Sequence, residues 1–186
     1  IDWDNKYPGR DMWNCKVRSV GVAMAMQCAG ISSVDTAAVE IKLNDDGFYT
    51  LMIGAADMGT GCDTILAQMA ADCLECDIDN IIVHGVDTDQ SPYDTGSYAS
   101  STTYITGGAV IKTCEKMRKR IIEEASKALG CSIDNLEFDG KKVFSLVDEK
   151  EISLIDIANN TLVGGFNTIS ESESHYSEVS PPPFMV

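Results

Sequence analysis

Residues 51–64, LMIGAADMGTGCDT, join an apolar strand-like run to a glycine-rich loop and then to the start of a helical pattern. Glycine lets backbone amides approach a ligand closely, and the first turn of a helix leaves N–H groups without an intrahelical partner. Such N–H groups, together with the helix dipole, bind phosphate-like anions. The stretch therefore predicts a strand, a ligand loop and a helix, in that order.

A similar arrangement recurs at residues 92–103, PYDTGSYASSTT. Ser97 and the run 100–103 supply five hydroxyl groups at the start of a long helical pattern, and Gly96 keeps the loop narrow. One or two hydroxyls would be explained by helix capping, but five exceed what capping needs. We therefore expect two helix starts that face one ligand carrying several phosphate groups.

The remaining patterns place these two loops in an α+β fold: a mixed sheet with two long helices. In the first helix, Ile65, Met69 and either Leu74 or Cys73 are expected to face the core, and in the second an i+4 series runs from Ala109 to Leu129. Gly107 and Gly108 within that series would bend the helix or allow close packing. The expected strands are 19–29, 36–42, 48–54 and 81–84, with a hairpin at 136–144 and helices at 62–75, 101–129 and from 153; the segment after 162 is irregular or extended.

Composition limits the possible partners. The 186 residues are 44% apolar, enough for a core, and carry 14 basic against 29 acidic side chains, a formal charge of −15. Nucleic acids and anionic membrane surfaces are poor partners for such a chain. It has no apolar run long enough to span a bilayer and does not begin like a signal peptide. Seven cysteines without regular spacing predict a reduced, cytoplasmic protein.

Two other groups of residues could bind metals, and both have a simpler explanation. Cys73 and Cys76 form a C-x-x-C pair, but a zinc site needs a second pair, so core packing is the favoured interpretation. Asp87, Asp89 and Asp94 do not match a calcium loop, and aspartate commonly stabilises turns. We expect no metal ligands among these residues.

The sequence also lacks the residues usually needed for nucleophilic catalysis and for nucleotide hydrolysis. Neither His84 nor His175 lies in a recognisable nucleophile motif, so each is expected to be an ordinary surface or core residue. Neither ligand loop contains the lysine of a phosphate-binding P-loop. We therefore expect no catalytic residue in this chain.

Four ordered blocks of this sequence resemble the molybdenum-cofactor-binding subunit of the xanthine dehydrogenase and aldehyde oxidase family. Their order and spacing agree with the family from about residue 16 to about residue 143, and the closing SHYSEVSPPPFMV resembles the family's next segment, which leads into a strand. The blocks are 18–30 (RSVGVAMAMQCAG), 54–64 (GAADMGTGCDT), 87–94 (DTDQSPYD) and 96–110 (GSYASSTTYITGGAV).

The resemblance implies a part of an enzyme that oxidises a purine, an aldehyde or an N-heterocycle, with water as the oxygen source. The implied cofactor is molybdopterin with molybdenum, possibly as the cytosine dinucleotide, while iron–sulfur clusters and FAD would lie on partner domains or subunits. Residues 1–15 would be an extended segment, 16–163 the molybdopterin-binding lobe, and 164–186 an extended tail leading to a missing strand. The implied cofactor-binding residues are Met58, Gly59, Thr60, Gly61, Thr64, Ala99, Ser100, Ser101, Thr102 and Thr103.

The sequence departs from the family pattern at two of these positions. Relatives often have glutamine at the position of Thr60 and arginine at that of Ser101. The family's catalytic glutamate belongs to a later segment, so the isolated chain is expected to be inactive. An alternative is a non-catalytic α+β module that binds a phosphorylated small molecule.

Overall fold

The structure, a computed structural model, describes residues 3–27, 30–165, 167–176 and 184–185. The chain divides into two compact units, Ile1–Gln27 with Pro183–Val186 and Cys28–Pro182. The first unit contains a short helix and two small antiparallel strand pairs. Its elements are α1 (Trp3–Lys6), β1 (Arg10–Asp11) paired with β2 (Val17–Arg18), and β3 (Met26–Gln27) paired with β11 (Phe184–Met185).

The expected buried strand at 19–29 is wrong for most of its length. Residues 19–25 are exposed and form no strand, and residues 28–29 lie outside the described part of the chain. An apolar run becomes a buried strand only where another strand and a packed face meet it. Within the described residues of the first unit, no such partner accompanies 19–25.

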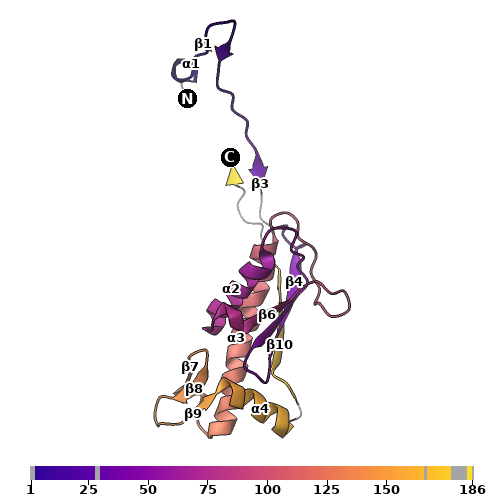
Figure 1. Ribbon diagram of the computed structural model, residues 1–186, viewed down its shortest axis with the longest axis vertical. Coiled ribbons are helices and arrows are strands. Elements are labelled where there is room, and N and C mark those ends of the chain that lie inside the picture. Colours follow the sequence, from indigo (N-terminus) through magenta and orange to yellow (C-terminus); the bar gives the residue numbers. More distant parts are fainter. Residues whose placement is uncertain (1–2, 28–29, 166, 177–183, 186) are drawn as a thin grey trace. The chain divides into compact units, whose positions relative to one another are not determined.

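The second unit is built on a mixed four-stranded sheet with the order β10-β4-β5-β6 (Figure 1). β4 and β5 are antiparallel, β5 and β6 are parallel, and β10 pairs antiparallel with β4. Residues in β4 alternate between buried and half-buried, which matches the period of two in its apolar pattern. The strands are β4 (Thr36–Leu43), β5 (Tyr49–Ile53), β6 (Ile81–His84) and β10 (Ser170–Tyr176).

Two long helices, α2 (Cys62–Leu74) and α3 (Thr102–Leu129), cover the sheet, as predicted. The i+4 series of α3 is buried from Ala109 to Ala125. The expected inner face of α2 is confirmed at Leu74, which is fully buried, and at Met69, which packs against the core, but at Ile65 it is wrong because Leu66 is buried instead. Positions 65 and 66 are both apolar, so the packing of α3 against α2 decides which of the two side chains is buried.

α3 is the central helix of this unit, since it contacts α2, β4, β10 and α4. Gly107 and Gly108 permit the close packing. A Cβ atom on Gly107 would come 2.8 Å from the Met69 sulfur of α2, and one on Gly108 would overlap the His175 ring of β10. The close-packing interpretation of these two glycines is thus confirmed.

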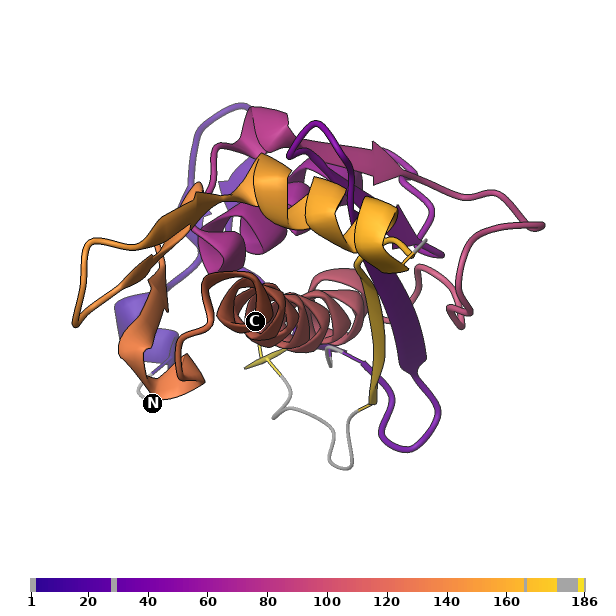
Figure 2. The same cartoon turned by 90° about the horizontal axis from the view of Figure 1, so that it is seen from below.

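A three-stranded antiparallel sheet and helix α4 (Leu154–Gly165) pack beside the C-terminal half of α3 (Figure 1). Figure 2 views α3 nearly end-on, with α4 on one side of it and the small sheet on another. Ser153 begins α4 as predicted, because its hydroxyl oxygen accepts the N–H of Asp156 at 3.1 Å. The strands are β7 (Leu136–Phe138), β8 (Lys142–Ser145) and β9 (Glu151–Ser153), and short 3-10 turns η1 (Ile78–Asn80) and η2 (Ile133–Asn135) precede β6 and β7.

Cys73 and Cys76 both pack against the edge of the core, which confirms their packing role. Burial and the nearby Asp77 carboxylate raise the pKa of the Cys76 thiol to about 11. In the described residues no helix is both long and apolar enough to cross a membrane.

We predict that alanine at Gly140 destabilises this unit more than alanine at Gly130. Both glycines have positive φ, 87° and 65°, so alanine at either should cost about 1–2 kcal/mol of backbone strain. A Cβ on Gly140 would also overlap the Glu75 carbonyl, whereas Gly130 has open space, and overpacking adds about 1–3 kcal/mol. Urea unfolding followed by circular dichroism measures both free energies, and equal losses would contradict the packing of the hairpin on α2.

A second prediction concerns thiol reactivity. The pKa of Cys76 rises from 9.0 to about 11 on folding, and a shift of two units leaves about a hundredfold less thiolate at neutral pH. Iodoacetamide should therefore modify Cys76 about a hundredfold more slowly in the folded protein than in urea. The exposed Cys15 is the internal control. Mass spectrometry resolves the two sites, and fast labelling of Cys76 in the folded protein would contradict its burial.

Candidate functional site

The two predicted ligand loops meet at one pocket. The pocket has a volume of about 360 Å³ and is lined from the first loop by Met58 and Thr60. The second loop and the first residues of α3 supply the rest of its wall, namely Ser97, Tyr98, Ser100, Ser101, Thr102 and Thr103.

Direct contacts hold the two loops together. The Ser97 hydroxyl donates to the Ala56 carbonyl at 3.0 Å. Gly54, at the end of β5, lies so close to the second loop that a Cβ there would overlap the Pro92 carbonyl and come 2.8 Å from the Asp94 Cβ. Glycine at position 54 is therefore needed for the close approach of the two loops. From the sequence, this residue was expected only to end a strand.

The first loop is closed on itself by Asp57. One oxygen of its carboxylate, Oδ1, accepts the N–H of Gly59 at 2.8 Å and that of Gly61 at 3.1 Å. These hydrogen bonds, led by the one from Gly59, lower the pKa of the exposed Asp57 carboxyl. The expectation that both amides point outward to a ligand anion is thus not met, because an internal carboxylate already occupies them.

Glycine is required in this loop for its backbone conformation. Gly59 has φ 101° and Gly61 has φ 71°, and a Cβ on either would meet no atom of this chain within 4 Å. A side chain at either position would therefore enter open space but would be strained by the backbone conformation.

Asp94 anchors the second loop in a comparable way. Its Oδ1 accepts the N–H of Gly96 at 2.8 Å, and its Oδ2 accepts the hydroxyl of Thr106, a buried residue of α3, at 3.0 Å. Asp87 likewise accepts the N–H of Asp89 at 2.9 Å. Asp87 and Asp94 therefore stabilise turns, as predicted.

The same loop contains backbone strain at the pocket wall. Ala99 and Ser100 have φ values of 49° and 53°, which non-glycine residues adopt at a cost of about 1–3 kcal/mol each. The Gly30 N–H donates to the Ala99 carbonyl at 2.8 Å and helps to hold this conformation. Consecutive strained residues of this kind cluster at ligand sites, which makes the loop a candidate binding surface.

α3 begins at this wall with an unusual N-cap. Ser101 is buried, and its hydroxyl donates to the Tyr98 carbonyl at 2.7 Å instead of capping the helix. The N-terminal end of a 28-residue helix therefore faces the pocket with its dipole and without a side-chain cap.

Most of the predicted binding residues are thus brought together, but not all of them. Gly59, Gly61 and Ala99 lie in the two loops without lining the pocket, and Thr64 is exposed on α2. Tyr98 lines the pocket and was not predicted. Gly96 is the residue that could have pointed to Tyr98. A Cβ on Gly96 would come 3.2 Å from the Tyr98 ring, so glycine at this position leaves room for the tyrosine.

Beside the first loop, ligand-type atoms of Asp57, Cys62 and Asp63 lie within 4.8 Å of one another. The Cys62 Sγ lies 3.7 Å from the Asp63 carboxylate, in a hydrogen bond, and burial raises the pKa of this thiol. A protonated thiol is a poor metal ligand, so this cluster is explained by its internal bonds.

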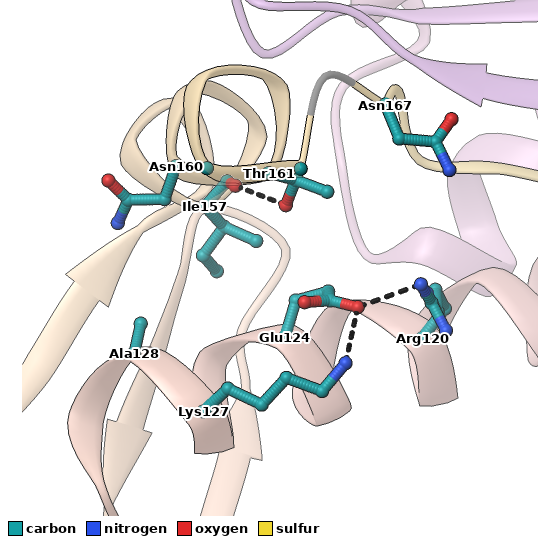
Figure 3. Close-up of a pocket in the computed structure, with 10 residues that line it drawn as sticks. Arg120, Glu124, Lys127, Ala128, Ile157, Asn160, Thr161 and Asn167 are labelled. Atoms are coloured by element: carbon teal, nitrogen blue, oxygen red, sulfur yellow. Dashed lines mark hydrogen bonds and ion pairs between the residues drawn. The ribbon is translucent and has the colours of Figure 1, made fainter.

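A larger pocket, of about 440 Å³, lies between the C-terminal half of α3 and α4 (Figure 3). Its cations are already paired: Arg120 and Lys127 each contact the Glu124 carboxylate at 2.8 Å. Arg120 also lies 3.8 Å from the Glu123 carboxylate, so two carboxylates on this helix are paired with its two cations and leave little positive charge for a phosphate group. The loop pocket is therefore the better candidate for an anionic ligand.

Comparisons with known proteins identify the family of this chain. A family model described as "Molybdopterin cofactor-binding domain" matches residues 1–184. "Probable hypoxanthine oxidase XdhD" of Escherichia coli (strain K12) is 33% identical over 176 residues, which cover 94% of this chain and 18% of that protein. "Xanthine dehydrogenase molybdenum-binding subunit" of Escherichia coli O157:H7 is 29% identical over 181 residues, covering 90% of this chain and 23% of that protein.

The fold is similar to that of a solved structure. Quinoline 2-oxidoreductase from Pseudomonas putida 86 matches with a TM-score of 0.70 at 17% identity, over 87% of this chain and 22% of that one. The chain thus spans about a fifth of the length of the relatives it matches. The family match over almost the whole sequence shows that this chain belongs to the molybdopterin cofactor-binding domain family of the molybdenum hydroxylases.

Proposed function

We propose that this chain is part of the molybdopterin-binding subunit of a xanthine dehydrogenase-type molybdenum hydroxylase, which oxidises a purine, an aldehyde or an N-heterocycle with water as the oxygen source. Membership of the molybdopterin cofactor-binding domain family supports the proposal that the chain binds molybdopterin. The printed names of the relatives, a hypoxanthine oxidase and a xanthine dehydrogenase subunit, support the reaction class.

The observation that carries this proposal is the meeting of the two loops at one hydroxyl-rich pocket. A phosphate needs donors, and here they would be the hydroxyls of Ser100, Thr102 and Thr103 together with the N-terminal end of α3. No lysine or arginine lines the pocket, so neutral donors would hold the charge. The described residues therefore fit a phosphate-bearing cofactor at this wall.

The first loop would play a different part. Because Asp57 occupies the amides of Gly59 and Gly61, this loop would contact the cofactor through the side chains of Met58 and Thr60. The molybdenum cofactor, when bound, would supply the oxidation chemistry. The residues of this chain would bind and orient it, and the proposed binding set remains the ten residues named from the sequence.

The complete enzyme would need partners. We propose iron–sulfur and FAD subunits or domains that carry electrons away, together with the remaining segments of the molybdopterin subunit. The relative named as a molybdenum-binding subunit supports such an assembly. The cytosine dinucleotide form of the cofactor and a cytoplasmic location belong to the same proposal, and the free state of the six described cysteines fits a reducing compartment.

We predict that Gly61→Val in the complete enzyme empties the molybdenum site while the protein stays folded. The variant would place a branched side chain at φ 71° and in the open space beside the pocket. Strain at this φ would break the Gly61 N–H bond to Asp57 and displace Met58 and Thr60, and a loss of about 1.5–3 kcal/mol in binding corresponds to about one to two decades of affinity. Molybdenum per protein, measured by mass spectrometry of the metal, reports the result.

Two control variants separate the possible causes. Gly61→Asn keeps a residue that tolerates positive φ but also fills the open space. If the cofactor needs that space, Gly61→Asn loses molybdenum as Gly61→Val does. Cys76→Ser should retain it, because that thiol packs at the core edge. Full occupancy in both Gly61 variants would argue for the non-catalytic alternative or for another site.

We also predict that the isolated 186-residue chain does not turn over hypoxanthine or an aldehyde. Among the described residues, the pocket wall offers hydroxyls and a thioether but no carboxylate or imidazole to act as general base. Spectrophotometric assays with an artificial electron acceptor test this directly. Measurable turnover by the purified chain would place the catalytic groups inside it.

A further inference from the structure

The Asp57 carboxylate is the main connection that closes the first loop. It accepts the N–H groups of Gly59 and Gly61 through a single oxygen, at 2.8 and 3.1 Å. Residues 56–60 are all exposed, so the loop gains little from burial. At its two ends, the Ala56 carbonyl accepts the Ser97 hydroxyl and the Gly61 carbonyl accepts the Ile65 N–H, and the Thr60 side chain hydrogen-bonds the Cys62 thiol.

The two glycines make this connection necessary. Glycine loses more conformational freedom on ordering than any other residue, and both glycines here have positive φ. A loop with such a sequence adopts one conformation only if specific bonds offset that entropy. The helix beyond it cannot supply them, because its N-cap is Gly61, which has no side chain.

Asp57 is bonded to the residues beside those that line the pocket. Its two close hydrogen bonds are with the amides of Gly59 and Gly61, and the amides of Thr60 and Asp63 also stabilise the carboxylate. Met58 and Thr60 line the pocket, whereas Asp57 does not. Met58 is 70% exposed, so packing within this chain does not orient it. The bonds to Asp57 therefore fix the backbone that carries both lining residues.

We propose that Asp57 is a positioning residue of the cofactor pocket: by accepting the amides of Gly59 and Gly61 it holds Met58 and Thr60 toward the cofactor without contacting it. This inference rests on the proposed function for its ligand. It goes further in stating that the Asp57 carboxylate occupies the amides of Gly59 and Gly61, so that the loop presents side chains and not free amides to the cofactor.

The test uses the complete enzyme with Asp57→Ala and Asp57→Asn. Asparagine keeps an oxygen that can accept both N–H groups, so it should restore what alanine loses. Asp139→Ala is the matched control, because Asp139 Oδ1 also accepts two amides, those of Lys141 and Lys142 at 3.0 and 2.9 Å, in the β7–β8 hairpin. This control shows whether removing the hydrogen bonds of any aspartate-closed turn has the effect, or only removing those of Asp57.

Two measurements are made on each variant. Hydrogen exchange of residues 58–61, on enzymes purified from molybdate-free medium, should become about threefold to tenfold faster in Asp57→Ala, as loss of roughly one net hydrogen bond implies. Molybdenum content after growth with molybdate should fall several-fold in the same variant. Asp57→Asn and Asp139→Ala should match the wild type in both.

The outcomes are distinguishable. Wild-type molybdenum content in Asp57→Ala despite faster exchange would overturn the positioning role. Loss of molybdenum in Asp57→Asn with unchanged exchange would show that the charge acts on the ligand directly, which also overturns it. A wild-type enzyme without molybdenum would instead refute the proposed function, and the exchange rates would still decide whether Asp57 fixes the loop.

Discussion

The close packing of α3 against its neighbours is the constraint on which the rest of the second unit depends. Gly107 and Gly108 let α2 and β10 approach the helix, and the buried Thr113 satisfies its hydroxyl by donating to the Ala109 carbonyl at 2.7 Å. The i+4 series of small and apolar residues then fills the space over the sheet. Because the first turn of α3 is also the wall of the loop pocket, this packing determines where that wall stands.

The strong negative charge of the chain makes the chemistry of the pocket unusual. A formal charge of −15 would repel a phosphorylated ligand at long range. Binding of such a ligand would then depend on short-range donors, namely the hydroxyls and the helix terminus at the pocket. The two cations near the other large pocket are paired with Glu123 and Glu124 on the same helix, which weakens any competing attraction there.

Both candidate ligand loops use an aspartate to satisfy their own amides. Asp57 closes the first loop, and Asp94 fastens the second to Thr106 of α3. Glycine-rich loops approach ligands closely only if they keep one shape, and an acceptor that belongs to the loop supplies that shape before the ligand arrives. The aspartates and glycines of these loops therefore act together, because the carboxylates accept the N–H groups of the glycines and fix the loop conformation.

Several elements were predictable because their local patterns were sufficient. The alternating residues of β4 and β5, the Ser153 cap of α4, and the turn at Asp139 all specify their structure within a few residues. The i+4 series of α3 identified its buried face correctly. The family resemblance, carried by four ordered blocks, is likewise a property of the sequence and is confirmed.

Other features depended on residues distant in the chain. β10, with the sequence SESESHY, has no apolar alternation, and its pairing along β4 is set by the free edge of that strand. The inner face of α2 moved from Ile65 to Leu66 because α3 covers only one side of it. The sequence by itself determined most local elements and the family, and it led us to expect two loops that face one ligand, since these follow from short-range sterics and pattern. Tertiary structure alone decided which side chains line the shared pocket and that Asp57 occupies the glycine amides, because both depend on the direction of side chains and N–H groups in space.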